Sequence, residues 1–260
     1  MSEENPYQMP GSPAAPVVAA PAASSTSPRP VDAGRGWDWI ADAFALFKKQ
    51  PGTWILILIV AVVCAMLLAM VPVIGALANF LLMQIFMGGL MLGCRALANN
   101  EPFELAHLFA GFKHNTGDLV VLGVLALAGW VVSMIPAIAI MGFGAFMALL
   151  MGSTPAAHIG GMGLSILLAL LVMLALAIPL YMALWFSPAL VALNNLKPVE
   201  AMKASFIGCL KNIVPFLVYS VIMMVFCIVA AIPLGLGFLV LGPVWVASVY
   251  TSYRDIFTVP

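Results

Sequence analysis

The sequence predicts an all-α polytopic membrane protein with about six transmembrane helices arranged as three hairpins, each preceded by an interfacial amphipathic helix. Three observations predict this fold. Hydrophobic residues make up 64% of the chain and charged residues 8%, which is too little charge to cover the surface of a soluble domain. Long apolar runs alternate with short connections, and only every second connection carries charged residues. A similar amphipathic segment precedes the first, third and fifth of these runs.

The N-terminal part of the chain, residues 1–34, is rich in Pro, Ala and Ser. It has no apolar block preceded by a basic segment, so it does not have the pattern of a signal peptide. Its apolar surface is too small to offset the entropy lost on ordering, and we therefore expect a disordered tail. The transmembrane helical domain is then expected to occupy residues 35–260.

About six apolar runs are long enough to cross a hydrocarbon core about 30 Å thick. In the run 54–71, the Ile, Leu and Val residues alone favour insertion by about 3 to 7 kcal/mol. The third run is longer than a modestly tilted helix needs and contains Pro136 and a Gly142/Gly144 pair. We expect either a kinked helix or a helix followed by a re-entrant segment there. The predicted spans are residues 54–71, 76–96, 119–150, 163–193, 213–231 and 234–253.

The connections between these runs predict the topology. Those after the first, third and fifth runs contain no Lys, Arg, Asp or Glu, whereas the basic and acidic residues fall in the tail, the other connections or the C-terminus. Because Lys and Arg beside short connections stay in the cytoplasm, both termini are predicted to be cytoplasmic, with an even number of crossings. His158 is then the only ionisable side chain on the far side.

The amphipathic segments end in a shared pattern in which large apolar residues are followed by lysine. Residues 44–49 read FALFKK, residues 109–113 read FAGFK, and residues 206–211 read FIGCLK. We interpret this pattern as a threefold internal repeat of an interfacial helix and a membrane hairpin. The predicted units are about 37–97, 102–194 and 198–256, and the second contains an insertion.

Each amphipathic helix is expected to lie in the headgroup plane, because its apolar residues recur at helical spacing. In the first copy Asp38, Asp42 and Lys48 face away from the apolar side. Trp54, just after that helix, is assigned to the same aromatic belt. The residues expected to anchor the protein at the interface are Trp37, Trp39, Phe44, Phe47, Phe109, Phe112 and Phe206.

The interiors of the predicted spans carry no charged side chain, which argues against a proton-coupled pump, a voltage sensor and a channel lined with charged rings. Gln84 is the most polar residue near mid-bilayer, and Asn79 lies nearer the surface on the same helix. We expect these amides to contact a neighbouring helix by hydrogen bonding, with substrate binding as the alternative. The Gly89-x-x-x-Gly93 pattern could let two helices approach closely.

The sequence predicts no catalytic, cofactor or metal site. Glu104 and His107 have the i, i+3 spacing of metal sites in helical bundles, but nothing in the spans completes such a site, and a solvated helix face is favoured. The four cysteines show no C-x-x-C spacing and are interpreted as small buried hydrophobes. No G-x-S-x-G, P-loop or complete G-x-G-x-x-G occurs. The chain is therefore not expected to be an enzyme.

The segments 36–39 (GWDW), 88–95 (GGLMLGCR), 107–112 (HLFAGF), 185–191 (WFSPALV), 201–206 (AMKASF) and 250–257 (YTSYRDIF) carry a family resemblance. Together they resemble an uncharacterised family of proteobacterial inner-membrane proteins. This resemblance covers residues 36–257 and implies a bacterial inner (plasma) membrane location, but no activity. More distantly, the hairpin repeat is similar to the membrane domain fused to some glycerophosphodiester phosphodiesterases. Since we expect no soluble phosphodiesterase domain in this chain, that activity is not implied.

Two functional hypotheses follow from these features. The first is a non-enzymatic membrane protein that binds membrane lipids at its cytoplasmic rim, or partner membrane proteins, or itself. Its basis is the set of amphipathic segments joined to charge-free spans. The alternative is a transporter or channel for an apolar or neutral small solute, with a cavity among the spans near Gln84 and Pro136. Acidic residues are interspersed with the basic ones, so no nucleic-acid partner is indicated.

Overall fold

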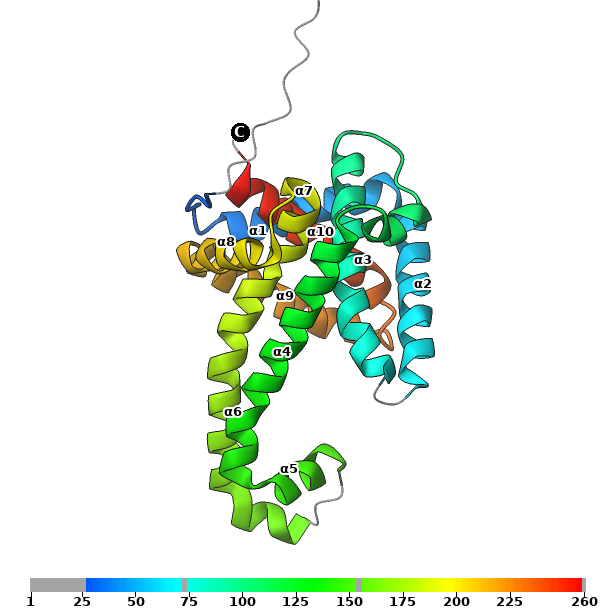
Figure 1. Cartoon of the computed structure of the whole chain (residues 1–260). Coiled ribbons are helices and arrows are strands. Elements are labelled where there is room, and N and C mark those ends of the chain that lie inside the picture. The colour runs from blue at the N-terminus through cyan, green and yellow to red at the C-terminus, as the bar shows by residue number, and fades with distance from the viewer. Residues whose placement is uncertain (1–26, 72–73, 153–155, 259–260) are drawn as a thin grey trace, which may run out of the picture.

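The computed structural model describes residues 27–71, 74–152 and 156–258, whose regular elements are helices (Figure 1). The predicted tail up to residue 26 lies outside the described residues, as does the side chain of His158. In chain order the elements are α1 (Arg35–Lys49), α2 (Pro51–Ala69), α3 (Ile74–Ala98), the 3₁₀-helix η1 (Leu105–Phe112), α4 (Thr116–Met141), α5 (Phe143–Leu150), α6 (Ala156–Trp185), α7 (Ser187–Asn194), α8 (Pro198–Lys211), α9 (Ile213–Ala231) and α10 (Phe238–Phe257).

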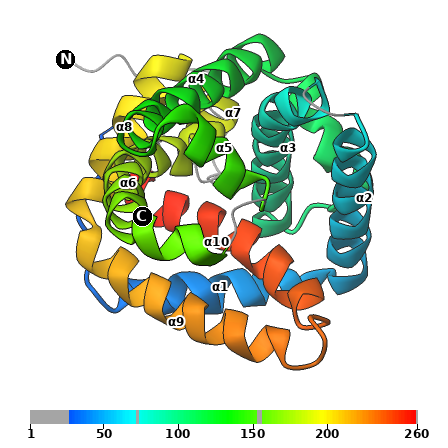
Figure 2. The ribbon, with the colours of Figure 1, turned by 90° about the horizontal axis from the view of Figure 1, so that it is seen from below.

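The charged residues gather at one end of the molecule. α1, η1, α7, α8 and the C-terminal end of α10 lie together at that end in Figure 1, and they or the segments beside them carry the described charged residues. α4 and α6 run side by side away from it and continue beyond the far ends of α2 and α3, with α5 at their tip. In Figure 2, which looks at the molecule from the α5 end, α9 and α10 flank α1. The opposite end therefore consists of apolar helices.

Five helical segments of the described chain are long and apolar enough to cross a membrane. They correspond to the first five predicted spans, and the run 213–231 coincides with α9. Each is rich in Ile, Leu, Val and Ala, and the share of its most apolar 18 residues that is buried inside the protein ranges from 6% to 39%. The segments are Pro51–Ala69, Ile74–Ala98, Thr116–Met141, Gly163–Asn194 and Ile213–Ala231.

The sixth predicted span, residues 234–253, forms the helix α10 but is not among these five segments. Its C-terminal half carries polar residues that are buried against other helices. Ser248 Oγ lies 2.7 Å from the Tyr219 hydroxyl, and Thr251 donates a hydrogen bond to the Trp39 carbonyl at 2.8 Å. Because protein groups satisfy these side chains, α10 can carry polarity that a lipid-facing helix could not. Within the described residues, five segments thus meet the length and composition of a span, and α10 differs from them in its buried polar half.

The third predicted run is divided into two helices rather than forming one kinked helix. α4 ends at Met141, and the following Gly142 has a φ of +78°, a backbone conformation that glycine adopts readily. α5 then turns away from the axis of α4 (Figure 1). Pro136 lies inside α4 without ending it. The break therefore occurs at the glycine, and the segment after it is a separate short helix.

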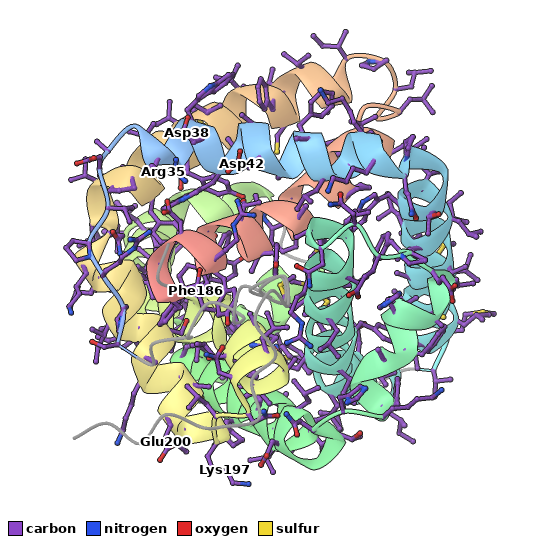
Figure 3. All side chains as sticks on the ribbon, turned by 90° about the horizontal axis from the view of Figure 1, so that it is seen from above. Arg35, Asp38, Asp42, Phe186, Lys197 and Glu200 are labelled. Atoms are coloured by element: carbon purple, nitrogen blue, oxygen red, sulfur yellow. The ribbon has the colours of Figure 1, made fainter. Side chains whose placement is uncertain are left out.

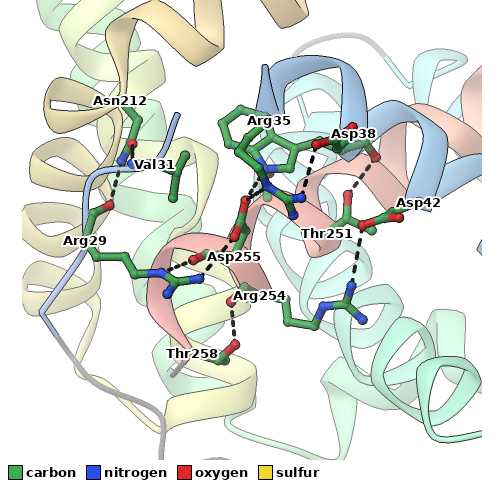
Figure 4. A network of polar contacts seen from close by, with 12 residues as sticks. Arg29, Val31, Arg35, Asp38, Asp42, Asn212, Thr251, Arg254, Asp255 and Thr258 are labelled. Carbon is green, nitrogen blue, oxygen red and sulfur yellow. Dashed lines mark hydrogen bonds and ion pairs between the residues drawn. The ribbon is translucent and has the colours of Figure 1, made fainter. Parts of the chain in front are cut away.

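The packed domain begins before the predicted boundary at residue 34. The backbone N–H of Arg29 donates to the Ile256 carbonyl at 3.0 Å. The Asn212 side chain holds the same segment, because it accepts from the Val31 N–H at 2.8 Å and donates to the Arg29 carbonyl at 3.0 Å (Figure 4). These contacts place the start of the described chain beside the C-terminal end of α10.

Two glycines of α3 allow η1 to lie directly against it. A Cβ atom at Gly89 would lie 2.5 Å from the His107 carbonyl oxygen, and one at Gly93 would lie 2.4 Å from the Phe103 ring. Neither position can accept a larger side chain without moving its neighbour. The Gly89-x-x-x-Gly93 pattern therefore does mark a close approach, although the partner is a 3₁₀-helix outside the predicted spans.

Candidate functional site

A polar network at the charged end joins the N-terminal segment, α1 and α10 (Figure 4). The Asp255 carboxylate accepts hydrogen bonds from Arg29 Nη2 at 3.1 Å, Arg35 Nε at 2.6 Å and Trp39 Nε1 at 2.9 Å. Its side chain is 10% exposed, whereas those of Arg29 and Arg35 are 42% and 35% exposed. A nearly buried carboxylate is thus held by two half-exposed guanidinium groups and an indole.

These contacts lower the pKa of Asp255. Burial is the largest influence and acts in the opposite direction, but the hydrogen bonds from Arg35 and Trp39 and the charges of Arg35 and Arg29 together outweigh it. The pKa of Arg35 is raised, chiefly by its hydrogen bond to Asp255. Both groups are therefore ionised at neutral pH, and the network stabilises the fold.

The structure divides the predicted anchoring residues into two groups. Trp39 is 0% exposed and donates to Asp255, and Trp54 is 1% exposed, so neither indole can reach a membrane surface. The anchoring interpretation therefore does not fit these two residues. Phe47 is also buried, and Phe206 is half-buried. The predicted anchoring residues that remain exposed are Trp37, Phe44, Phe109 and Phe112.

Glu104 and His107 close the N-terminus of η1. His107 Nδ1 accepts the Glu104 backbone N–H at 3.1 Å, and the Glu104 side chain accepts a hydrogen bond from the backbone of His107. This reciprocal arrangement is a capping box, which satisfies donors that a helix start leaves unpaired. Local structure therefore accounts for the i, i+3 spacing of these two residues.

A groove of about 610 Å³ lies between α1, α9 and α10, and we call it the lateral groove. The ring centroids of Trp37 and Phe226 lie 6.4 Å apart, and both residues line it. The ammonium group of Lys48, at the other end of α1, lies 5.2 Å from the centre of the Phe44 ring. Lys48 is the charged residue of the lining, and the other lining residues are aliphatic or aromatic. The groove therefore combines an apolar wall with a cation.

The two carboxylates of α1, the helix that carries Lys48, are already paired. Asp42 lies 3.6 Å from Arg254, and Asp38 lies 3.1 Å from Arg35 (Figures 3 and 4). Lys48 is exposed and forms no ion pair with any described residue. An anion that approached Lys48 would therefore meet a cation whose charge is not neutralised by a protein carboxylate.

A second cavity, of about 190 Å³, lies between α3, α4, α6 and α10, and we call it the central cavity. Gln84 lines it together with five aromatic residues, Phe80, Trp130, Tyr181, Trp185 and Trp245. The predicted cavity near Gln84 is therefore present, but Pro136 is not among the residues that line it.

The two amides predicted to lie inside the membrane do not pair with neighbouring helices. Neither the Gln84 nor the Asn79 side chain forms a hydrogen bond to a described residue. Asn79 instead lines a pocket of about 220 Å³ between α2, α3 and α10, which Trp54 also lines. The expected interhelical hydrogen bonds are thus missing from the described chain, and each amide instead lines a pocket.

Sequence reasoning missed the aromatic lining of the central cavity. Trp130, Tyr181, Trp185 and Trp245 come from three helices, and no motif links them. Their spacing from the nearest charged residue along the chain varies as well, so the sequence contains no signal that these side chains meet. Which helices are neighbours is decided by tertiary packing.

Comparisons with known proteins place the chain in a family. No protein-family model matches it, and no solved structure matches it. A protein of Burkholderia thailandensis named a "probable inner membrane protein" is 30% identical over 198 residues, which are 74% of this chain and 73% of the relative. The likeness to phosphodiesterase-linked membrane domains stays a prediction. The chain, whose described residues include five membrane-length helices, therefore belongs to a family of inner-membrane proteins that includes this Burkholderia protein.

Proposed function

We propose that this inner-membrane protein is a non-enzymatic lipid-binding protein, and that the lateral groove holds an anionic phospholipid. Both termini and the charged end of the molecule would face the cytoplasm. The three units, each a short helix followed by a hairpin, would place α1, η1 and α8 at that membrane surface.

The observation that carries the proposal is the apolar lateral groove with the unpaired cation Lys48 in its lining. Its volume of about 610 Å³ is in the usual range of ligand pockets, about 300 to 1,000 Å³. An acyl chain would lie along Phe44 and Phe226, and a phosphate would approach Lys48. A basic residue near the headgroups attracts an anionic lipid by about 1 kcal/mol. The lipid preference should therefore depend on this lysine.

Native mass spectrometry of the delipidated, detergent-purified protein tests this proposal. Phosphatidylglycerol and phosphatidylethanolamine would be added back separately to the wild type and to Lys48→Gln. We expect Lys48→Gln to weaken phosphatidylglycerol binding by about fivefold, which corresponds to about 1 kcal/mol, and to leave phosphatidylethanolamine binding nearly unchanged. Ala41→Phe, at an exposed position of the groove lining, should weaken both lipids because it fills the groove.

Lys203→Gln is the matched control, since Lys203 is an exposed lysine of α8 that does not line the groove. It should bind both lipids as the wild type does. If Lys48→Gln and Lys203→Gln bound phosphatidylglycerol equally, the proposed headgroup contact would be refuted. Retention of another protein instead of lipid would favour the binding of a partner membrane protein.

A transporter or channel for an apolar or neutral small solute is a second candidate function. It is favoured by the central cavity, which lies among candidate spans and is lined by Gln84. Proteoliposomes that release a neutral solute at a rate reduced by Gln84→Trp would support it. Release at the same rate from empty liposomes would refute it.

A further inference from the structure

The central cavity carries an inference that does not depend on the lateral groove. We propose that it is a binding site for a neutral, ring-sized apolar molecule that offers a hydrogen-bond acceptor such as a carbonyl oxygen. The residues that recognise this acceptor are Trp185 and Gln84.

Two residues that line the central cavity carry hydrogen-bond donors that lack partners in the described chain. The indole Nε1 of Trp185 is buried and forms no hydrogen bond with any described residue. The Gln84 amide also lacks a partner in the described chain. A buried donor without a partner is costly, because it has lost its bond to water without replacement. An acceptor on a bound molecule would remove that cost, whereas a pure hydrocarbon would not.

The walls of the central cavity suit a flat ring. The centroids of Trp185 and Trp245 lie 6.0 Å apart with their planes at 88°, and Tyr181 lies 5.6 Å from Trp185. Such surfaces offer faces and edges to an aromatic or cyclic molecule. The volume of about 190 Å³ is comparable with an apolar protein cavity of about 150 Å³ that binds benzene. One ring therefore fits.

The charge of the lining selects against ions. None of the described residues that line the central cavity is charged at neutral pH, and only Gln84 and the aromatic N–H and O–H groups are polar. An ion transferred there would lose its hydration without gaining a counter-charge. The ligand is therefore neutral.

A path from the lipid to the central cavity is also present. Tyr181 and Trp185 line both the central cavity and a larger pocket of about 330 Å³ between α6, α8 and α9. Tyr181 is 49% exposed, so it forms part of the outer surface as well. A molecule dissolved in the membrane could pass from the outer pocket to the cavity along these two side chains.

Two probes that differ in one group test the proposal by ¹⁹F NMR. 4-Fluoroacetophenone carries a carbonyl, and 1-ethyl-4-fluorobenzene has a methylene in its place. We expect both to bind the detergent-solubilised full chain saturably, and the ketone to bind about five to ten times more tightly after correction for partition into empty micelles. Equal affinities, or no saturable binding of the ketone, would overturn the proposal.

Two substitutions remove the donors separately. Trp185→Phe keeps the ring and removes the N–H, and Gln84→Leu removes the amide at similar volume. Each substitution should reduce the preference for the ketone over the ethyl compound to about twofold or less. The ethyl compound should bind as it does to the wild type, and this unchanged affinity shows that the cavity is intact. Trp37→Phe, the same substitution in the lateral groove, should keep the full preference. A preference for the ketone that survived both cavity substitutions would refute the assignment of these two donors.

Discussion

At the scale of single residues, Asp255 connects parts of the chain that are far apart in sequence. Its carboxylate binds Arg29 and Arg35 from the N-terminal region and the indole of Trp39, although Asp255 itself lies three residues before the end of the described chain. Because its side chain is nearly buried, an uncharged replacement would leave donors without their acceptor. This residue therefore has a larger structural role than its position near the C-terminus indicates.

The stability of the purified protein is expected to fall in acid because of Asp255. The folded protein lowers the pKa of this group below its unfolded value of about 3.9, so its stabilising effect is complete above that value. The effect is lost as the pH falls through the folded pKa. Asp255→Asn should lower stability at pH 7 by about 1 to 2 kcal/mol, because its arginine partners are partly solvated. Thermal unfolding in detergent at neutral and acidic pH measures both effects.

The control for this prediction is Glu200→Gln. Glu200 is an exposed carboxylate in the first turn of α8 and forms no ion pair in the described chain, so its loss should leave the pH profile unchanged. We expect Asp255→Asn to flatten the acid side of the profile. An identical profile for Asp255→Asn and the wild type would mean that Asp255 is not the group responsible.

At the scale of the elements, the contact between α3 and η1 depends on the absence of side chains. Gly89 meets the backbone of η1 rather than a flexible side chain, so the neighbour cannot adjust by changing a rotamer. The sequence indicated that Gly89 and Gly93 permit close approach, but not what would approach. The answer required the fold, because η1 follows α3 through a short connection and turns back onto it.

Gly89→Ala is expected to separate η1 from α3 and to destabilise the protein by about 1 to 3 kcal/mol. Gly117→Ala in the first turn of α4 is the control, since a Cβ there would meet nothing within 4 Å. Alanine also favours a helix more than glycine does, so this control should be neutral or slightly stabilising. Melting temperatures in one detergent compare the two, and equal values would contradict the packing described for Gly89.

At the scale of the whole molecule, charged residues and purely apolar helices lie at opposite ends. The described charged residues lie near α1, η1, α8 and the end of α10, whereas α5 and the tips of α4 and α6 are apolar (Figure 1). A protein with this distribution has one orientation in which its charges stay in water and its apolar helices stay in lipid.

This distribution predicts the sidedness of the protein. In a background with its four native cysteines replaced, Lys113→Cys and Lys203→Cys should react with a membrane-impermeant maleimide only from the cytoplasmic side. Met151→Cys, next to α5, should react from the opposite side, since Met151 is 71% exposed. Labelling of Lys113→Cys and Lys203→Cys from different sides would refute the proposed topology.

Composition and hydropathy were sufficient to predict a helical membrane protein, because hydrocarbon accepts only long uncharged segments whose backbone groups are paired internally. The sequence also predicted α9 from its apolar run and a close approach at Gly89 from the glycine spacing. Both features depend on residues that are near one another in the chain. The tertiary structure alone shows that the C-terminal half of α10 is buried against other helices and that Trp39 binds Asp255 instead of the membrane surface. It also brought Gln84 and Trp185 to one cavity. These features depend on which helices are neighbours, and hydropathy, which measures transfer into lipid, does not encode neighbours.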